Sequence, residues 1–140
     1  MGKILCATRG GEDSYRTQDA AIALARERSD SLVFLYVVDV RFLDKTSAPI
    51  VVDVEGEIGK MGEFLLVMAK ERAADAGIDA ETVCREGRVR QQLAAVAREL
   101  DVSTVVLGRP GGAGSAFSLD ALQELAARIR AEADAEVVIV

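Results

Sequence analysis

The stretch SLVFLYVVD, residues 31–39, carries the strongest strand signal in the chain. It is nearly continuous in apolar residues, which is typical of a strand covered on both faces rather than one with a solvent-facing side. Strands of that kind belong to parallel sheets that have helices packed above and below. Residues 31–39 therefore predict an α/β fold, for which the flanking sequence should supply further strands and helices.

Upstream of this strand, the sequence predicts one more strand and one helix. Residues 3–8 form a short apolar run that ends before two glycines, and they predict a buried strand. Residues 12–30 have apolar side chains at helical spacing and predict a helix. Asp13 or Ser14 is expected to be its N-cap, because both side chains accept hydrogen bonds from free backbone N–H groups.

Downstream, the sequence predicts a long irregular segment followed by a second helix. Pro49 and Gly56 are expected to break regular structure within residues 41–57, and residues 50–54 are expected to form a short extended piece. Gly77 is expected to end the helix in a left-handed conformation. The predicted stripe of this helix, spaced by three or four residues, consists of Ile58, Met61, Leu65, Met68 and Arg72.

The remaining sequence continues to alternate between strands and helices. The predicted elements are a strand over 80–86 with Ala80, Thr82 and Cys84 on one face and Gly87 at its end, a helix over 89–100, a strand over 103–108, a helix with the stripe Leu122, Leu125, Ala126 and Ile129, and a strand over 135–140. Strict β-α alternation predicts one doubly wound domain, residues 1–140, with a parallel sheet and helices on both faces. A ligand crevice is expected beyond the carboxyl ends of the strands.

The composition excludes several classes of function. The chain has 140 residues, a formal charge of −6 and no histidine. An acidic protein is a poor partner for nucleic acid, and the lack of histidine argues against zinc sites and Ser-His or Cys-His catalysis. No paired acids follow a strand, so we expect no enzyme activity. With no membrane span or signal peptide in the sequence, a cytoplasmic location is expected. Cys6 and Cys84 are expected to be reduced core thiols.

Several segments, taken in order, resemble the universal stress protein family. They are KILCATRGGEDS (3–14), YVVD (36–39), REG (85–87), VVLGRPGG (105–112) and the final hydrophobic strand. The resemblance covers essentially the whole chain. It implies a Rossmann-like sheet of the adenine nucleotide alpha hydrolase type with strand order 3-2-1-4-5. It also implies a stress-related role without a well-defined reaction, and a homodimer formed through residues 135–140.

The same resemblance bears on ATP binding. Family members that bind ATP carry a glycine, two residues, a second glycine, nine residues and then Gly-Ser or Gly-Thr. Gly108 and Gly111 match the first two positions, but Ala121 and Leu122 stand where Gly-Ser or Gly-Thr is needed. Arg9 replaces an aspartate that belongs to the family's nucleotide pocket. The sequence therefore predicts a stress-response module without a tightly bound cofactor.

The start of the last helix gives a second reason to expect weak ATP binding. Ser118 is expected to be the N-cap, which places Asp120 in the first turn. A carboxylate there satisfies the helix dipole and repels an incoming triphosphate.

A candidate ligand crevice still follows from these positions. It consists of Arg9, Gly10, Val38, Gly108, Arg109 and Gly111. Val38 stands where the family's backbone contacts adenine. Arg9 and Arg109 are expected past the ends of neighbouring strands, where two guanidinium groups either hold a small anion or pair with nearby carboxylates. The alternative function is a nucleotide-binding regulatory switch, with ATP held by Arg109 and the loop 108–115.

The last strand, EVVIV at residues 136–140, is expected at an edge of the sheet. A bare edge of strong β propensity invites aggregation. Pairing with the same strand of a second copy covers this edge, so a homodimer is expected from physical grounds as well as from the resemblance. Partners other than a second copy are expected to be a small anionic ligand or a protein.

Overall fold

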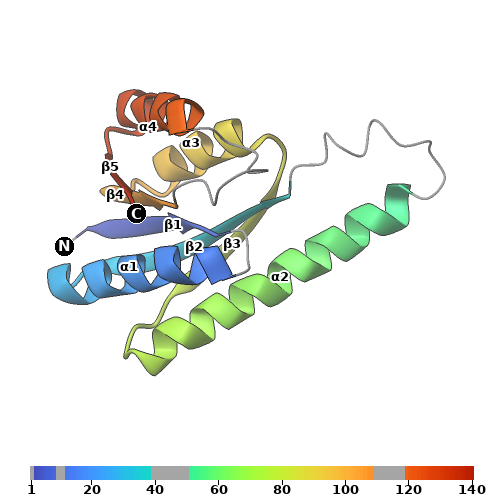
Figure 1. The fold of residues 1–140 in the computed structure, drawn as a ribbon, viewed down its shortest axis with the longest axis horizontal. Coiled ribbons are helices and arrows are strands. Elements are labelled where there is room, and N and C mark those ends of the chain that lie inside the picture. The colour runs from blue at the N-terminus through green and yellow to red at the C-terminus, as the bar shows by residue number, and fades with distance from the viewer. Residues whose placement is uncertain (1, 9–11, 39–50, 109–118) are drawn as a thin grey trace.

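The described part of the chain forms a five-stranded, fully parallel sheet with the strand order β3-β2-β1-β4-β5 (Figure 1). A computed structural model describes residues 2–8, 12–38, 51–108 and 119–140. The strands are β1 (Lys3–Ala7), β2 (Ser31–Val38), β3 (Glu81–Glu86), β4 (Thr104–Leu107) and β5 (Glu136–Ile139). The predicted α/β class and the order 3-2-1-4-5 are therefore confirmed.

In the described ranges, four helices cover the two faces of this sheet. They are α1 (Glu12–Arg28), α2 (Val51–Asp75), α3 (Val89–Glu99) and α4 (Leu119–Ala133). Figure 1 shows α1 and α2 on one side of the sheet and α3 and α4 on the other. Two separate clusters of buried side chains, one on each side, confirm this layering.

The strand SLVFLYVV lies near the middle of the sheet, as its apolar sequence predicts. β2 pairs with β1, where Leu5 lies opposite Val33, and with β3, where Val33 lies opposite Glu81. From Leu32 to Leu35 every side chain is buried. Such a run without alternation reflects helices on both faces, since each of its two sides meets a packed layer.

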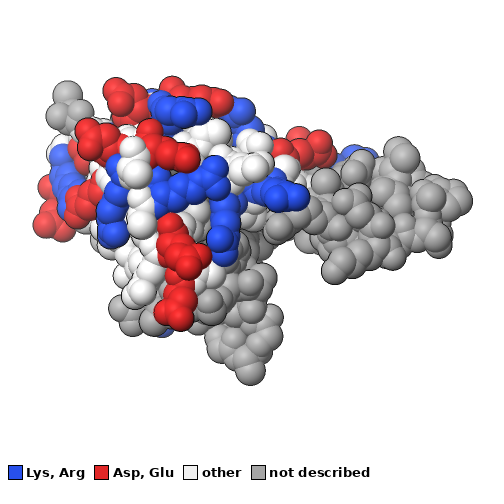
Figure 2. Space-filling model, turned by 90° about the horizontal axis from the view of Figure 1, so that it is seen from above, with Lys and Arg blue, Asp and Glu red and all other residues white. Residues whose placement is uncertain are grey.

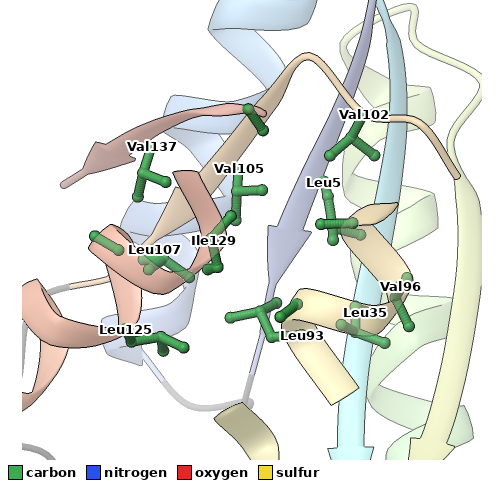
Figure 3. Close-up of a cluster of buried hydrophobic side chains, with 14 of the residues drawn as sticks. Leu5, Leu35, Leu93, Val96, Val102, Val105, Leu107, Leu125, Ile129 and Val137 are labelled. Atoms are coloured by element: carbon green, nitrogen blue, oxygen red, sulfur yellow. The ribbon is translucent and has the colours of Figure 1, made fainter. Parts of the chain in front are cut away.

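The cluster under α3 and α4 shows how the helical stripes predicted from the sequence fill the core (Figure 3). Leu125 and Ile129 of α4 and Leu93 and Val96 of α3 point toward the sheet. Strand residues such as Leu5 lie beneath them. All four residues of the predicted α4 stripe are buried, so that stripe is confirmed.

The first helix covers nearly the residues that the sequence predicts, but the predicted N-cap is wrong. α1 starts at Glu12, so Asp13 and Ser14 are residues of its first turn and neither is the N-cap. An N-cap residue lies just outside the helix, so a residue whose own backbone is helical cannot take that role.

The second helix begins earlier than the sequence predicts, and the prediction of an extended piece over residues 50–54 is wrong. α2 starts at Val51 and runs without interruption through Gly56. The three-or-four spacing of the stripe continues upstream of Ile58 to Val54 and Val51. Extending an existing helix through one glycine costs only about 1 kcal/mol, which is less than the cost of nucleating a new helix.

The face that α2 turns to the core also differs from the prediction. Gly62, Leu66, Ala69 and Ala73 are buried, whereas Met61 and Met68 are exposed. A Cβ added at Gly62 would lie 2.6 Å from the Tyr36 ring, so the helix backbone lies directly against β2. The small residues of α2 face the core because they permit this close approach of the helix to β2.

The end of α2 agrees with the prediction. Gly77 has a φ of 85°, in the left-handed region. The backbone N–H groups of Gly77 and Ile78 donate to the carbonyl oxygens of Ala74 and Ala73, at 2.9 Å each. This pair of bonds is a Schellman motif, which satisfies carbonyl groups that the helix end leaves free.

Candidate functional site

The candidate site lies at the switch point of the sheet, where successive strands are added on one side up to β3 and on the other side from β4 onward. β1 and β4 are neighbours, with Leu5 opposite Val105. The chain leaves β1 for α1 on one face and leaves β4 for α4 on the other (Figure 1). Helices that diverge in this way open a crevice beyond the carboxyl ends of two adjacent parallel strands, which is where α/β sheets bind ligands.

Four of the six predicted crevice residues, Arg9, Gly10, Arg109 and Gly111, lie outside the described residues. Their role at the crevice therefore stays a prediction. The two strands that they follow are confirmed as neighbours. Val38 and Gly108 are described, and both lie at carboxyl ends of strands.

Val38 is the last residue of β2, and its side chain is buried. Its carbonyl oxygen accepts a hydrogen bond of 2.9 Å from the backbone N–H of Gly87. Gly87 has a φ of 138°, which favours glycine, and it ends β3 as predicted. The Val38 carbonyl is therefore already engaged in closing the β2–β3 end of the sheet.

Gly108 follows β4 directly and lies against α1. A Cβ at this position would be 2.5 Å from Oγ1 of Thr17. Only a residue without a side chain allows the end of β4 and the helix to approach this closely. Gly108 therefore has a packing role, whether or not a ligand binds beside it.

Buried polar side chains gather at the start of α1, beside the crevice. Thr8, Ser14, Thr17 and Gln18 are all buried. Nε2 of Gln18 donates a 2.8 Å hydrogen bond to Oγ1 of Thr8. Within the described part of the chain, every buried side-chain nitrogen and oxygen atom has a hydrogen-bond partner. This network fixes α1 to the end of β1 and forms a rigid wall.

Sequence reasoning missed this polar network. Ser14 and Gln18 are four residues apart and therefore share a helix face with Thr17. Polar residues on the face of α1 that also carries its buried alanines are the signal that could have revealed the network. Thr8 offered no such signal, since a threonine at a strand end is common.

The two cysteines have different environments, and the prediction is correct for only one of them. Cys6 is buried in β1, and burial raises the pKa of its thiol to about 12, so it stays protonated. Cys84 is exposed, because β3 is an edge strand. Partial burial, together with Glu63 and Glu86, raises the pKa of the Cys84 thiol, which disfavours the reactive thiolate.

The first turn of α4 carries an acidic side chain and a buried apolar one. α4 begins at Leu119 and carries Asp120 in its first turn, as predicted. Ser118, the predicted N-cap, lies outside the described residues. Leu122 is only 5% exposed and packs in the core cluster with Leu125. This end of α4 therefore presents a carboxylate, while the Leu122 side chain points into the core.

The surface of the α3–α4 side mixes both signs of charge. Figure 2 shows Lys and Arg interspersed with Asp and Glu over this face. Pairs such as Arg90 and Glu124, 3.9 Å apart, link the helices. Surfaces that bind nucleic acid are instead typically dominated by clustered Lys and Arg. Within the described ranges, no group of His, Cys, Asp and Glu side chains could hold a metal ion.

A search of the described helices for a long apolar span found none that could cross a membrane.

Comparisons with known proteins agree with the fold. A model of the universal stress protein family matches residues 1–140. Universal stress protein YxiE of Bacillus subtilis (strain 168) is 32% identical over 122 residues, which are 81% of this chain and 82% of YxiE. The structure of UspA from Lactobacillus plantarum superposes with a TM-score of 0.77 at 16% identity, covering 99% of this chain and 97% of that one.

A further solved structure is a universal stress protein in complex with cAMP. It superposes with a TM-score of 0.69 at 23% identity, and the match covers 99% of this chain and 96% of that one. The family model spans the full chain, YxiE exceeds 30% identity over four-fifths of both sequences, and the sheet order agrees with the family resemblance. On this evidence, the chain belongs to the universal stress protein family.

Proposed function

We propose that this universal stress protein is a homodimeric, non-catalytic stress-response module that does not hold ATP tightly. It acts in the cytoplasm through contacts with a protein or a small anionic ligand. The observation that carries the proposal is that Leu122, at the motif position of the hydroxyl residue, is buried in the core. ATP-binding relatives need a hydroxyl residue at this point of the chain, and here a leucine packs into the core instead.

The electrostatics of the α4 terminus support the same proposal. A helix N-terminus attracts phosphate through its free N–H groups and its partial positive charge. Asp120 lies in that first turn and is exposed. Its carboxylate offsets the positive end of the dipole and repels a polyphosphate. Both the missing hydroxyl and the added charge act against ATP.

Thermal unfolding with added nucleotide tests the proposal. We expect 1 mM Mg-ATP to raise the melting temperature by less than about 1 °C, because the stabilisation, RT ln(1 + [L]/Kd), is small when the ligand concentration does not exceed Kd. A rise of several degrees would contradict the proposal. The Asp120→Asn variant is expected to show a larger rise than the wild type, whereas Glu132→Gln, at the other end of α4, should match the wild type.

The second candidate function is a nucleotide-binding switch that uses Arg109 and the loop 108–115. Because one solved relative is a complex with cAMP, a nucleotide with a single phosphate is a candidate ligand as well as ATP. The same melting experiment with cAMP distinguishes the two functions. A switch predicts a rise of several degrees that Arg109→Ala removes, while the module without a tightly bound nucleotide predicts no rise with either ligand.

The geometry of β5 supports a dimer through residues 135–140. β5 is an edge strand of the sheet. The N–H groups of Glu136 and Val140 donate to the carbonyl oxygens of Ser103, just before β4, and Leu107, its last residue, at 3.0 and 2.9 Å. Because N–H directions alternate along a strand, Val137 and Ile139 turn theirs away from β4. These outward groups are available to pair with β5 of a second copy.

The Ile139→Pro variant tests this interface. Proline removes an outward N–H group and leaves the β4–β5 hydrogen bonds in place, which edge strands tolerate. We expect the wild type to sediment as a dimer at micromolar concentration and the variant to sediment as a monomer with native circular dichroism. A variant that remains a dimer of unchanged affinity would contradict pairing through β5. Val138→Lys, which adds charge without removing an N–H group, is the second test of the same edge.

The non-catalytic part of the proposal is supported by the available chemistry. The chain contains no histidine. Burial keeps the Cys6 thiol protonated and therefore a poor nucleophile. Incubation with Mg-ATP should release no phosphate above the rate of a buffer control, and turnover that scales with protein concentration would contradict this part.

A further inference from the structure

The exposed large apolar side chains of the described residues gather on α2. Met61, Phe64, Val67 and Met68 are 59%, 63%, 53% and 37% exposed. In Figure 1, no other described helix or strand covers the side of α2 that faces away from the sheet. Single exposed apolar residues are common, but a contiguous group on one element marks an interaction surface.

The charges around this group have a definite order. Lys60, Phe64, Val67 and Glu71 are spaced by four, three and four residues, so they form one line along the helix. All four are exposed. The line therefore reads basic, apolar, apolar, acidic from the N-terminal to the C-terminal end.

We propose that this line is the centre of an interface with a second copy of the same chain, with the two α2 helices antiparallel. We call the surface the α2 seam; it consists of Lys60, Met61, Glu63, Phe64, Val67, Met68, Lys70 and Glu71. A two-fold axis between residues 65 and 66 places Phe64 opposite Val67 of the second copy. The same axis places Lys60 opposite Glu71 of the second copy, at both ends of the interface.

The flanks of the line are complementary under the same axis. A two-fold axis perpendicular to the helix pair keeps each flank on its own side. Met61 then lies beside Met68 of the second copy on one flank. On the other flank, Glu63 lies beside Lys70 of the second copy. Every pair is therefore either apolar with apolar or acidic with basic.

The order of charges along the α2 seam indicates both which partner binds there and whether its helix runs parallel or antiparallel to α2. A parallel arrangement would place Lys60 against Lys60 and Glu71 against Glu71, and like charges across an interface are unfavourable. An unrelated partner would not require a surface that is complementary to itself under a two-fold axis. The self-complementary order therefore favours a second copy in the antiparallel direction.

Contacts on the inner side of α2 fix the direction in which the α2 seam points. Nε and Nη2 of Arg72 donate to Oδ1 and Oδ2 of Asp19, on α1, at 2.8 and 2.9 Å. The same guanidinium lies 4.6 Å from the centre of the Tyr15 ring. Gly62 rests against Tyr36. The helix is thus held against rotation, and a rigid surface loses little entropy on binding.

The α2 seam is separate from the interface proposed for β5. α2 covers the β2–β3 side of the sheet, and β5 lies at the opposite edge. The inference therefore goes beyond the proposed function and does not depend on it. If both interfaces form, dimers joined through β5 associate further through α2.

Sedimentation equilibrium of the full-length Ile139→Pro variant tests the α2 seam without a contribution from β5. At low salt this protein should self-associate as its concentration rises. Phe64→Glu should weaken the association at least about a hundredfold, because it places two carboxylates at the centre of the interface. If the Ile139→Pro background does not fold, the same measurement is made in the wild-type chain, following the association step beyond the dimer.

A charge-reversal experiment distinguishes pairing between copies from other effects. Lys60→Glu and Glu71→Lys should each weaken association about tenfold, and the double variant should return to within about threefold of the parent. The two residues are three helical turns apart in one chain, so recovery requires contact between copies. Arg98→Glu, on α3, is the matched control and should leave association unchanged.

Three results would overturn the proposal. They are a parent protein that remains monomeric up to millimolar concentration, single reversals without effect, and a double variant as weak as the single ones. Each of these is distinct from the failure of the β5 dimer, which Ile139→Pro measures alone.

Discussion

Helices α4 and α2 carry apolar stripes of the same spacing, yet only one of them faces the core. In α4 the predicted residues Leu122, Leu125, Ala126 and Ile129 are all buried. In α2, two residues of the predicted stripe, Met61 and Met68, are exposed to solvent. The periodicity identifies both segments as helices, but it identifies the buried face of only one.

The difference arises because α2 has apolar residues on two faces. Its second face contains Gly62, Leu66, Ala69 and Ala73, and this face is buried. A helix that offers small residues can lie closer to the sheet, so the Tyr36 ring fits against Gly62. The larger apolar side chains of α2 therefore lie on its outer face, where they are accessible to the second copy proposed above.

The largest expected effect is the contrast between two truncations to alanine. Ile129→Ala should lower the free energy of unfolding by about 2–5 kcal/mol, because it opens a cavity in the core. Met61→Ala should change it by less than about 0.5 kcal/mol, since the side chain is already in solvent. Urea denaturation at low micromolar concentration measures both. Equal losses would mean that α2 turns its stripe inward in solution.

The next effect concerns the small face of α2. Gly62→Ala should lower the free energy of unfolding by about 1–3 kcal/mol, because the new Cβ overlaps the Tyr36 ring. The change is opposite to helix propensity, which favours alanine by about 1 kcal/mol. Combining Gly62→Ala with Tyr36→Ala should remove the extra cost. A stabilised Gly62→Ala variant would show that α2 does not lie against β2.

The smallest effect concerns the ion pair that holds α2 to α1. Hydrogen bonds from Arg72 keep the pKa of Asp19 below its ordinary value. A carboxyl with a lower pKa in the folded state stabilises the protein above its unfolded pKa of about 3.9, and this contribution is lost as the pH falls through the folded value. Asp19→Asn should therefore cost about 0.5–1 kcal/mol at pH 7, because the pair is exposed.

A pH series provides the control for this ion pair. The difference between the wild type and Asp19→Asn should shrink as the pH is lowered below about 4. Glu132→Gln breaks the 3.1 Å pair with Arg128 inside α4 and should cost only about 0.3–0.5 kcal/mol. A difference for Asp19→Asn that is constant with pH would show that the ion pair contributes nothing.

Part of the candidate site could be predicted from the sequence, because those features depend only on residues that are close together in the chain. Gly77 and Gly87 both have positive φ, as expected for glycines that end a helix and a strand. Asp120 lies in the first turn of α4, as expected for a helix that starts just before it. Gly108 was predicted for a ligand, but the structure gives it a packing reason, since its neighbour Thr17 is distant in sequence.

The sequence by itself determined the class of fold and the order of its elements. Continuous apolar strands require helices on both faces, and right-handed crossovers leave few alternatives. Only the tertiary structure decided which face of α2 is buried, that Cys84 lies on an exposed edge, and that Thr8 and Gln18 share a hydrogen bond. These outcomes depend on distances between segments far apart in the chain, and no local pattern of residues encodes such distances.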